Sequence, residues 1–324
     1  MFSRIKESRS LLMGLAILGV VIFHAPFVIS HYKLRVIHDN LCCGVDLFLF
    51  FSGLGACHSI RSHGGKGYLK NRLRRLLPGL VPVLVLWSLL MHFLGYLSWK
   101  EFFGSITLLG WWLGLYKQLN WYFSAVWAFF LAAVPLYRLF CRTKHPVLLW
   151  LGLCMVTVVI QWIFPGYKAS MLVCRAMVFL TGMLFGRLEQ QKCPHENRIR
   201  LISYLFLVLG LWYMVIVYRY DGWGLGYRLG LWWYPYAIFT PGLVILVSDL
   251  AALLRRFSPM KVLMRPFEQL GESSGEILMI HMAIFKIIQY VTKISNIWWW
   301  LVIALCLIAG VCYRKFAVKR LPFS

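Results

Sequence analysis

Long apolar stretches separated by short polar segments recur along the whole chain of 324 residues. At about 1.5 Å of helical rise per residue, each is long enough to cross a hydrocarbon core about 30 Å thick. The pattern therefore predicts a bundle of about ten transmembrane helices, at residues 11–30, 41–60, 76–97, 120–140, 146–164, 170–188, 200–219, 230–254, 272–292 and 297–313. A shorter stretch, 102–116, contains three glycines. It is interpreted as interfacial or re-entrant rather than as a further span.

The composition agrees with an all-α polytopic integral membrane protein. Hydrophobic residues make up 60% of the chain and charged residues 14%, a balance that no water-soluble fold needs. The first apolar stretch has no small-residue cleavage site, so it is interpreted as a span and not as a removed signal peptide. No segment is polar enough for a separate soluble domain, and we expect one membrane domain over residues 1–324. The nine cysteines are scattered without metal-ligand spacing, so we expect no metal site.

Positive charge is unevenly distributed between alternate polar segments. The chain has 34 Lys and Arg against 11 Asp and Glu, a formal net charge of +23. With ten spans and a cytoplasmic N-terminus, 24 of these cations fall in inner segments and eight in outer loops. Because cytoplasmic segments of membrane proteins are enriched in Lys and Arg, this distribution predicts that both termini are cytoplasmic. It also argues against nucleic acid as a partner, since topology already accounts for most of the charge.

Four ionisable side chains fall at similar depths in different predicted spans. His24 is expected about 9 Å below the outer end of the first span, and Asp46 about 8 Å into the second. Arg175 and Lys286 occupy comparable depths in the sixth and ninth spans. Ionisable residues inside a membrane are costly and are often functional. A histidine, a carboxylate and two cations in one layer are therefore candidates for a functional site.

Two interpretations of this layer are open. In the first, the charges form buried structural pairs, such as Asp46 with Arg175. In the second, His24 is a reactive base, Asp46 orients its imidazole and stabilises its charged form, and Arg175 stabilises an oxyanion. His281 lies nearer the midplane, and Glu276 lies one turn from the inner surface.

A basic segment precedes the third predicted span. It reads YLKNRLRRLLPG over residues 68–79, and Arg72 and Arg75 share a helical face because they are three residues apart. One interpretation is a cytoplasmic anchor of the following span. The other is a clamp for a phosphorylated cytoplasmic donor, because guanidinium groups match the geometry of phosphate.

Six segments of the chain follow one another in the order of a known set of motifs: GLAILGVVIFH (14–24), GVDLFLFFSGLGA (44–56), NRLRRLLP (71–78), NWYFSAVWAFFLAAVP (120–135), RAMVFLTGMLFG (175–186) and LGESSGEILMIH (270–281). In these segments the chain resembles the acyltransferase-3 family of bacterial integral membrane acyltransferases, over nearly its whole length. In this comparison His24 matches the family's proposed catalytic histidine, and Asp46 and Ser52 belong to its second-helix signature. Where the family commonly has an arginine eleven residues before that histidine, this chain has Met13. Arg9, one turn earlier on the same helical face, is our candidate replacement.

The resemblance implies transfer of an acyl group, usually acetyl, from cytoplasmic acyl-CoA to a hydroxyl of a cell-envelope glycan or lipid-linked sugar. The reaction would take place in the bacterial cytoplasmic membrane, with acyl-CoA as donor substrate and no resident cofactor. Arg72, Arg75 and Arg9 would bind the donor, and His24 would act as base or covalent acyl carrier. A separate extracytoplasmic transferase would complete the transfer if the final acceptor is an extracellular polymer. Further candidates for a relay or for the cavity lining are Glu276, His281, Lys286 and Ser52.

A transporter or export channel is the alternative function, because buried charges also bind anions or relay protons. The arginines before the third span and the ordered segments favour the enzyme, and the sequence contains no visible inverted repeat to favour transport. A sensory or structural module is a third class. We expect no additional enzyme domain, because the chain ends eleven residues after Tyr313.

Overall fold

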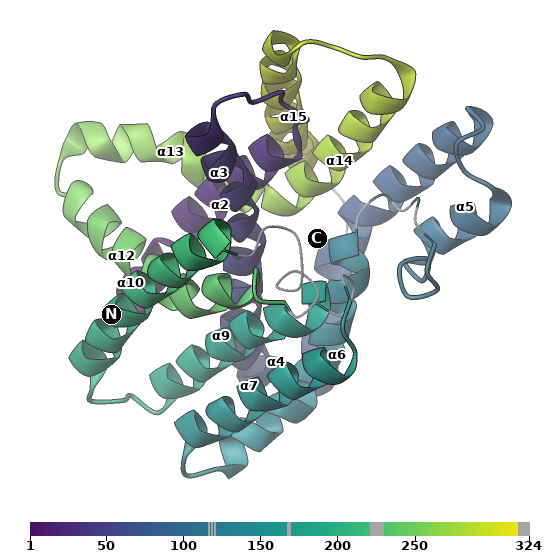
Figure 1. Cartoon of the computed structure of the whole chain (residues 1–324). Helices are drawn as coiled ribbons and strands as arrows, with labels where there is room; N and C mark the ends of the chain where they lie inside the picture. The colour runs from purple at the N-terminus through teal and green to yellow at the C-terminus, as the bar shows by residue number, and fades with distance from the viewer. Residues whose placement is uncertain (116, 118, 120, 167–169, 221–229, 317–324) are drawn as a thin grey trace. The chain divides into compact units, whose positions relative to one another are not determined.

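The computed structural model describes residues 1–115, 117, 119, 121–166, 170–220 and 230–316. Every regular element in this part of the chain is helical (Figure 1). Eight helical segments there are long and apolar enough to cross a membrane. The prediction of an all-α polytopic membrane protein is therefore confirmed. In chain order the elements are α1 (Phe2–Glu7), α2 (Arg9–His24), α3 (Tyr32–Asn40), η1 (Leu41–Cys43), α4 (Gly44–Phe93), α5 (Trp99–Ile106), α6 (Trp121–Arg142), α7 (Pro146–Ile163), η2 (Ser170–Cys174), α9 (Arg175–Gln190), α10 (Glu196–Tyr220), α12 (Tyr234–Leu254), α13 (Ser258–Glu272), α14 (Ser274–Val291) and α15 (Asn296–Phe316).

The second and third predicted spans are consecutive parts of one long element, α4. Its 50 residues would extend about 75 Å if straight, more than twice the thickness of a hydrocarbon core. At Gly64 the backbone leaves the helical region, with φ 68° and ψ 175°, a conformation that glycine adopts readily. We call residues 44–63 the first arm of α4 and residues 65–93 its second arm. Eight segments thus meet the length requirement where ten stretches were predicted, because α4 contains two of them and α2 is shorter than a full span.

The first span ends earlier than its apolar pattern predicts. The stretch 11–30 was expected to be helical throughout, but α2 ends at His24 and the backbone is irregular from residue 25 to residue 30. Pro26 explains this end, because proline disfavours helical geometry in the residue before it. His24 is therefore the last residue of its helix, and the predicted helix end at residue 30 is wrong. Asp46 similarly lies in the first turn of α4.

The stretch 102–116 contains the end of the short helix α5. Eight residues are too few to cross a membrane, in agreement with the interpretation that this stretch is not a further span. The helix begins with a capping box between Ser98 and Glu101. Burial alone would raise the pKa of the Glu101 carboxyl, but hydrogen bonds from Ser98 and the charge of Lys117 hold that pKa below its usual value.

The contacts within the chain group it into two compact units, each assembled from three separate segments. Unit 1 comprises residues 1–12, 45–68 and 131–265, and unit 2 comprises residues 13–44, 69–130 and 266–324. The prediction of one membrane domain over the whole chain stays a prediction.

In unit 1, α9 packs closely against the first arm of α4. A Cβ atom added at Gly53 would lie 2.1 Å from the carbonyl oxygen of Phe179, and one at Gly182 would lie 2.1 Å from that of Phe50. The two helices therefore touch backbone to backbone, as small residues allow in membrane bundles. α10 and α12 also pack along one another in this unit (Figure 1).

In unit 2, α14 and α15 form a helical hairpin (Figure 1). Side chains of α14 also contact the second arm of α4 and the residue that follows it. Near one end of α14, the Tyr290 hydroxyl donates a hydrogen bond of 3.0 Å to the Leu94 carbonyl. Four residues earlier on α14, the Lys286 ammonium lies 5.8 Å from the centroid of the Trp87 ring. The two contacts follow in the same order along α14 and along the second arm of α4, so the two helices run parallel.

Candidate functional site

Two histidines meet in unit 2, at the end of α2 and in the middle of α14. Nε2 of His281 lies 3.1 Å from Nδ1 of His24. On its other side, Nδ1 of His281 lies 2.9 Å from the carbonyl oxygen of Ile277, four residues earlier on the same helix. Both histidines are candidates from the sequence, but at different predicted depths. The early end of α2 and the packing of α14 bring them into contact.

The hydrogen bonds of this pair define which nitrogen is basic. A carbonyl oxygen only accepts hydrogen bonds, so Nδ1 of His281 carries the hydrogen that it donates to Ile277. In neutral His281 the other ring nitrogen, Nε2, is then an acceptor, and Nδ1–H of His24 must be the donor to it. With these hydrogens assigned, the ring nitrogen that keeps a free lone pair is Nε2 of His24. His24 therefore presents a basic nitrogen, and its imidazole is held by His281 together with a hydrogen bond to the backbone of Val20, one turn earlier on α2.

The surroundings of the pair separate the two roles further. His281 is fully buried, whereas His24 is half-buried. Lys286, one and a half turns beyond His281 on α14, is close enough for its charge to act on His24. The indole Nε1 of Trp87, beside Lys286, is buried and has no hydrogen-bond partner among the described residues. The site thus combines two imidazoles in contact with each other and a nearby cation.

The second candidate pair, Asp46 and Arg175, lies in unit 1. Both side chains are buried, and Nη1 of Arg175 is 3.5 Å from Oδ2 of Asp46. The guanidinium carbon of Arg175 also lies 4.7 Å from the centroid of the Trp233 ring. The sequence suggested this pairing as its structural interpretation, and the ion pair is present. A catalytic role of Asp46 and Arg175 toward His24 stays a prediction, because those residues belong to different units.

Ser52 and Arg9, the other candidates in unit 1, have less defined surroundings. Ser52 is half-buried in the first arm of α4. Arg9 is the first residue of α2 and is exposed. Their predicted roles in the cavity and in donor binding stay predictions.

A basic cluster forms in unit 2, where three helix segments meet. Arg72 and Arg75 lie on the second arm of α4, and the guanidinium carbon of Arg72 is 5.2 Å from the centroid of the Phe130 ring. Arg75 is exposed and lies within electrostatic range of Arg72, Glu276 and Arg314. In the sequence, Arg314 is one of the cations of the inner segments. Its position near the end of α15 does not indicate that it lies with Arg72 and Arg75 of the predicted donor clamp.

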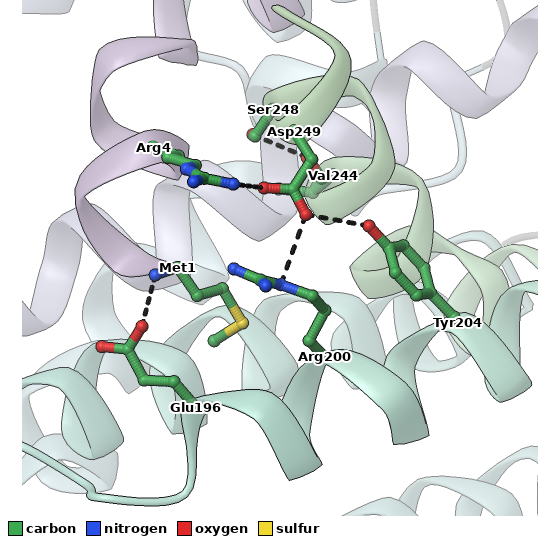
Figure 2. A network of polar contacts seen from close by, with 8 residues as sticks. All are labelled: Met1, Arg4, Glu196, Arg200, Tyr204, Val244, Ser248 and Asp249. Atoms are coloured by element: carbon green, nitrogen blue, oxygen red, sulfur yellow. Dashed lines mark hydrogen bonds and ion pairs between the residues drawn. The ribbon is translucent and has the colours of Figure 1, made fainter. Parts of the chain in front are cut away.

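A separate charge network in unit 1 was also missed by sequence analysis. Figure 2 shows Asp249 of α12 at its centre. Its carboxylate accepts hydrogen bonds of 2.7 Å from Arg4 and 2.9 Å from the Tyr204 hydroxyl, and lies 3.3 Å from Nε of Arg200. The network links α1, α10 and α12. The sequence contains one indication of it, namely that acidic residues are rare in this chain.

The contacting histidines and the buried charges within apolar helices define a polytopic membrane protein with ionisable groups in its interior. A family model described as an acyltransferase domain, that of the acyltransferase-3 family, matches residues 11–313. The chain therefore belongs to this family, and it is a membrane acyltransferase. No curated protein and no solved structure matches the chain.

Proposed function

We propose that this enzyme moves an acyl group, in the first instance acetyl, from cytoplasmic acyl-CoA to a hydroxyl of a cell-envelope glycan or lipid-linked sugar. The family membership supports acyl transfer in a membrane. The single observation on which the proposal rests is the contact between His24 and His281, because it leaves a basic nitrogen on His24, the less buried of the two.

In the proposed reaction, Nε2 of His24 removes the proton from the acceptor hydroxyl while its oxygen attacks the thioester carbonyl. A carbon–oxygen bond forms, the carbon–sulfur bond breaks, and the departing CoA thiolate takes the proton back from the imidazolium. His281 stabilises that imidazolium by accepting its Nδ1–H. The C-terminus of α2, at His24, favours the same positive charge through the helix dipole.

A covalent version of the reaction uses the same nitrogen. Nε2 of His24 then attacks the thioester carbonyl itself, CoA leaves, and the acceptor hydroxyl subsequently takes the acyl group from the imidazole. In both versions a negative charge develops on the carbonyl oxygen and needs a cation or a donor beside it. Lys286 supplies such a cation within unit 2, in addition to Arg175, which was predicted for this role.

The test measures transfer of label from acetyl-CoA into envelope glycan, in membranes containing equal amounts of wild-type or variant protein. We expect His24→Ala to reduce transfer by about a hundredfold or more, because general-base catalysis contributes about that much. His145→Gln, at an exposed histidine before α7, is the matched control and should be neutral. Equal transfer by wild type and His24→Ala would remove His24 from the chemistry. Absence of transfer by the wild type, with a soluble sugar acceptor present, would favour the transporter.

His281→Gln tests the positioning role separately. Glutamine retains an acceptor oxygen but not the fixed ring geometry, so we expect a partial loss of activity and a displaced pH–rate profile. A simple packing role for His281 would lower the amount of folded protein without changing the profile of what remains.

A further inference from the structure

The basic cluster of unit 2 is built by the packing of α15 against α14. A Cβ atom added at Gly310 would lie 2.4 Å from Cγ1 and 2.8 Å from Cα of Ile277, so the two helices are in backbone contact there. Arg314 follows Gly310 by four residues, about one helical turn, and Glu276 directly precedes Ile277. The close contact therefore sets the register that brings Arg314 to Glu276, with Nη1 and Oε2 3.4 Å apart.

A second contact joins the end of α15 to the second arm of α4. The hydroxyl of Tyr313 donates a hydrogen bond of 3.2 Å to the carbonyl of Gly79. Gly79 is one turn beyond Arg75, and Tyr313 is adjacent to Arg314. This contact explains why Arg75 and Arg314, far apart in the sequence, act on each other electrostatically.

The cluster has more positive charge than its own carboxylate can balance. Glu276 is buried, and its negative charge attracts Arg75. The two cations Arg72 and Arg314 repel Arg75. Arg75 makes no hydrogen bond or ion pair with any described residue. Nε of Arg314 is buried and likewise has no hydrogen-bond partner in this part of the chain. Arg75 and Arg314 thus have N–H donors that no described residue uses. Such guanidinium groups are suited to binding a phosphate dianion.

We infer that Arg314 and Arg75 together bind a phosphate group of the donor, and that this phosphate displaces Glu276 from Arg314. The inference rests on the proposed function and extends its donor site to a residue of α15. Without donor, Glu276 holds the Arg314 guanidinium in place and limits the cost of a cluster of like charges. The N-terminal turn of α14 stabilises the Glu276 carboxylate in either state.

The experiment titrates CoA into the purified full-length protein in phosphatidylcholine nanodiscs and measures its dissociation constant. We expect Arg314→Gln to weaken CoA binding by about tenfold to a hundredfold, the range for lost hydrogen bonds to a charged group. Glu276→Gln should act in the opposite direction and strengthen binding severalfold, because it removes the competing carboxylate. Arg74→Gln makes the same charge change on another face of the α4 arm and should change binding less than about twofold.

The opposite signs separate this inference from a purely structural ion pair. A structural pair predicts that Arg314→Gln and Glu276→Gln both reduce thermal stability and change CoA binding alike, which would overturn the inference. Arg314→Lys is the second variant if Arg314→Gln does not fold; it keeps the charge and should lose part of the affinity. 3′-Dephospho-CoA identifies the phosphate: if it binds wild type and Arg314→Gln equally, the 3′-phosphate is the group that Arg314 contacts.

Three further outcomes distinguish the other possibilities. If CoA binds, and Arg75→Gln weakens it while Arg314→Gln does not, the inference fails and the proposed function stands. If the wild type does not bind CoA at all, the proposed donor is wrong and the inference falls with it. If phosphatidylglycerol nanodiscs abolish the effect of Arg314→Gln, the site belongs to a lipid phosphate and the inference is overturned.

Discussion

The role of a buried ionisable residue depends on which neighbour satisfies it. Asp46 and Arg175 satisfy each other in unit 1, and Trp233 lies against the guanidinium. A buried pair of this kind often adds little stability compared with apolar residues, whereas removing one partner leaves an uncompensated charge. Its presence therefore does not distinguish a structural role from a catalytic one, and a mutant cycle is needed.

We expect Asp46→Asn and Arg175→Met each to destabilise the protein by about 3–5 kcal/mol, and the double variant by clearly less than their sum. Thermal unfolding in detergent measures the stabilities, and labelled acetyl transfer measures activity. If the pair is purely structural, activity returns with stability in the double variant. If Asp46 also acts on His24, the double variant is stable but inactive. Additive destabilisation would contradict the ion pair itself.

His24 illustrates how a single contact defines chemistry at the residue scale. A lone histidine in an apolar helix has two tautomers and no defined reactive nitrogen. The carbonyl of Ile277, acting through His281, removes that ambiguity. The sequence predicts that His24 is the reactive base and that a carboxylate orients it. In the structure, the side chain in contact with His24 is a second imidazole, that of His281.

At the scale of elements, glycines determine how closely the helices of unit 1 approach. Gly53 on the first arm of α4 and Gly182 on α9 face the partner backbone reciprocally. Both belong to segments that resemble family motifs, and the structure gives those glycines a physical reason. A side chain at either position would separate the helices that hold Asp46 and Arg175 together.

We therefore expect Gly182→Leu to destabilise the protein by about 1–3 kcal/mol or more through overpacking. Gly152→Leu is the matched control, because a Cβ atom at Gly152 in α7 meets nothing within 4 Å. Thermal unfolding in detergent should show a lower midpoint for the first variant and an unchanged or higher midpoint for the second. Equal midpoints for both variants would contradict the close contact of α9 with α4.

Element ends were the least predictable feature of the helices. Hydropathy alone continued the first span to residue 30, although Pro26 contained the signal for an earlier end. The joining of two predicted spans into α4 depended on residues 61–75, a polar segment that hydropathy assigns to a loop but that is helical on both sides of Gly64. Amphipathic α13, with a mean hydropathy too low for a span, was not anticipated as an element.

At the scale of the whole molecule, the distribution of Lys and Arg predicts a cytoplasmic N-terminus. The charge network around Asp249 shows that some of these cations also have structural partners (Figure 2). Both uses are compatible, because an ion pair formed after insertion does not cancel the earlier effect of the charges on orientation.

The orientation predicts the accessibility of single cysteines in a background without the native ones. Lys33→Cys, in the first outer loop, should react with a membrane-impermeant maleimide in intact cells, and Lys144→Cys, in an inner segment, should react only after permeabilisation. The reverse result would invert the topology. Reaction of both residues from outside would show that the number of spans between them is even rather than odd.

The sequence by itself determined the class of the protein, because apolar length and charge asymmetry respond directly to the bilayer and need no tertiary contact. It also determined the family, through short ordered segments that the match over residues 11–313 confirms. Only the tertiary structure decided which ionisable groups meet. The pairing of His24 with His281, and of Arg314 with Glu276 beside Arg75, depends on helix ends and on the register of packed helices. Both are set by contacts between residues far apart in the chain, such as Gly310 with Ile277, and depth along a single helix does not contain that information.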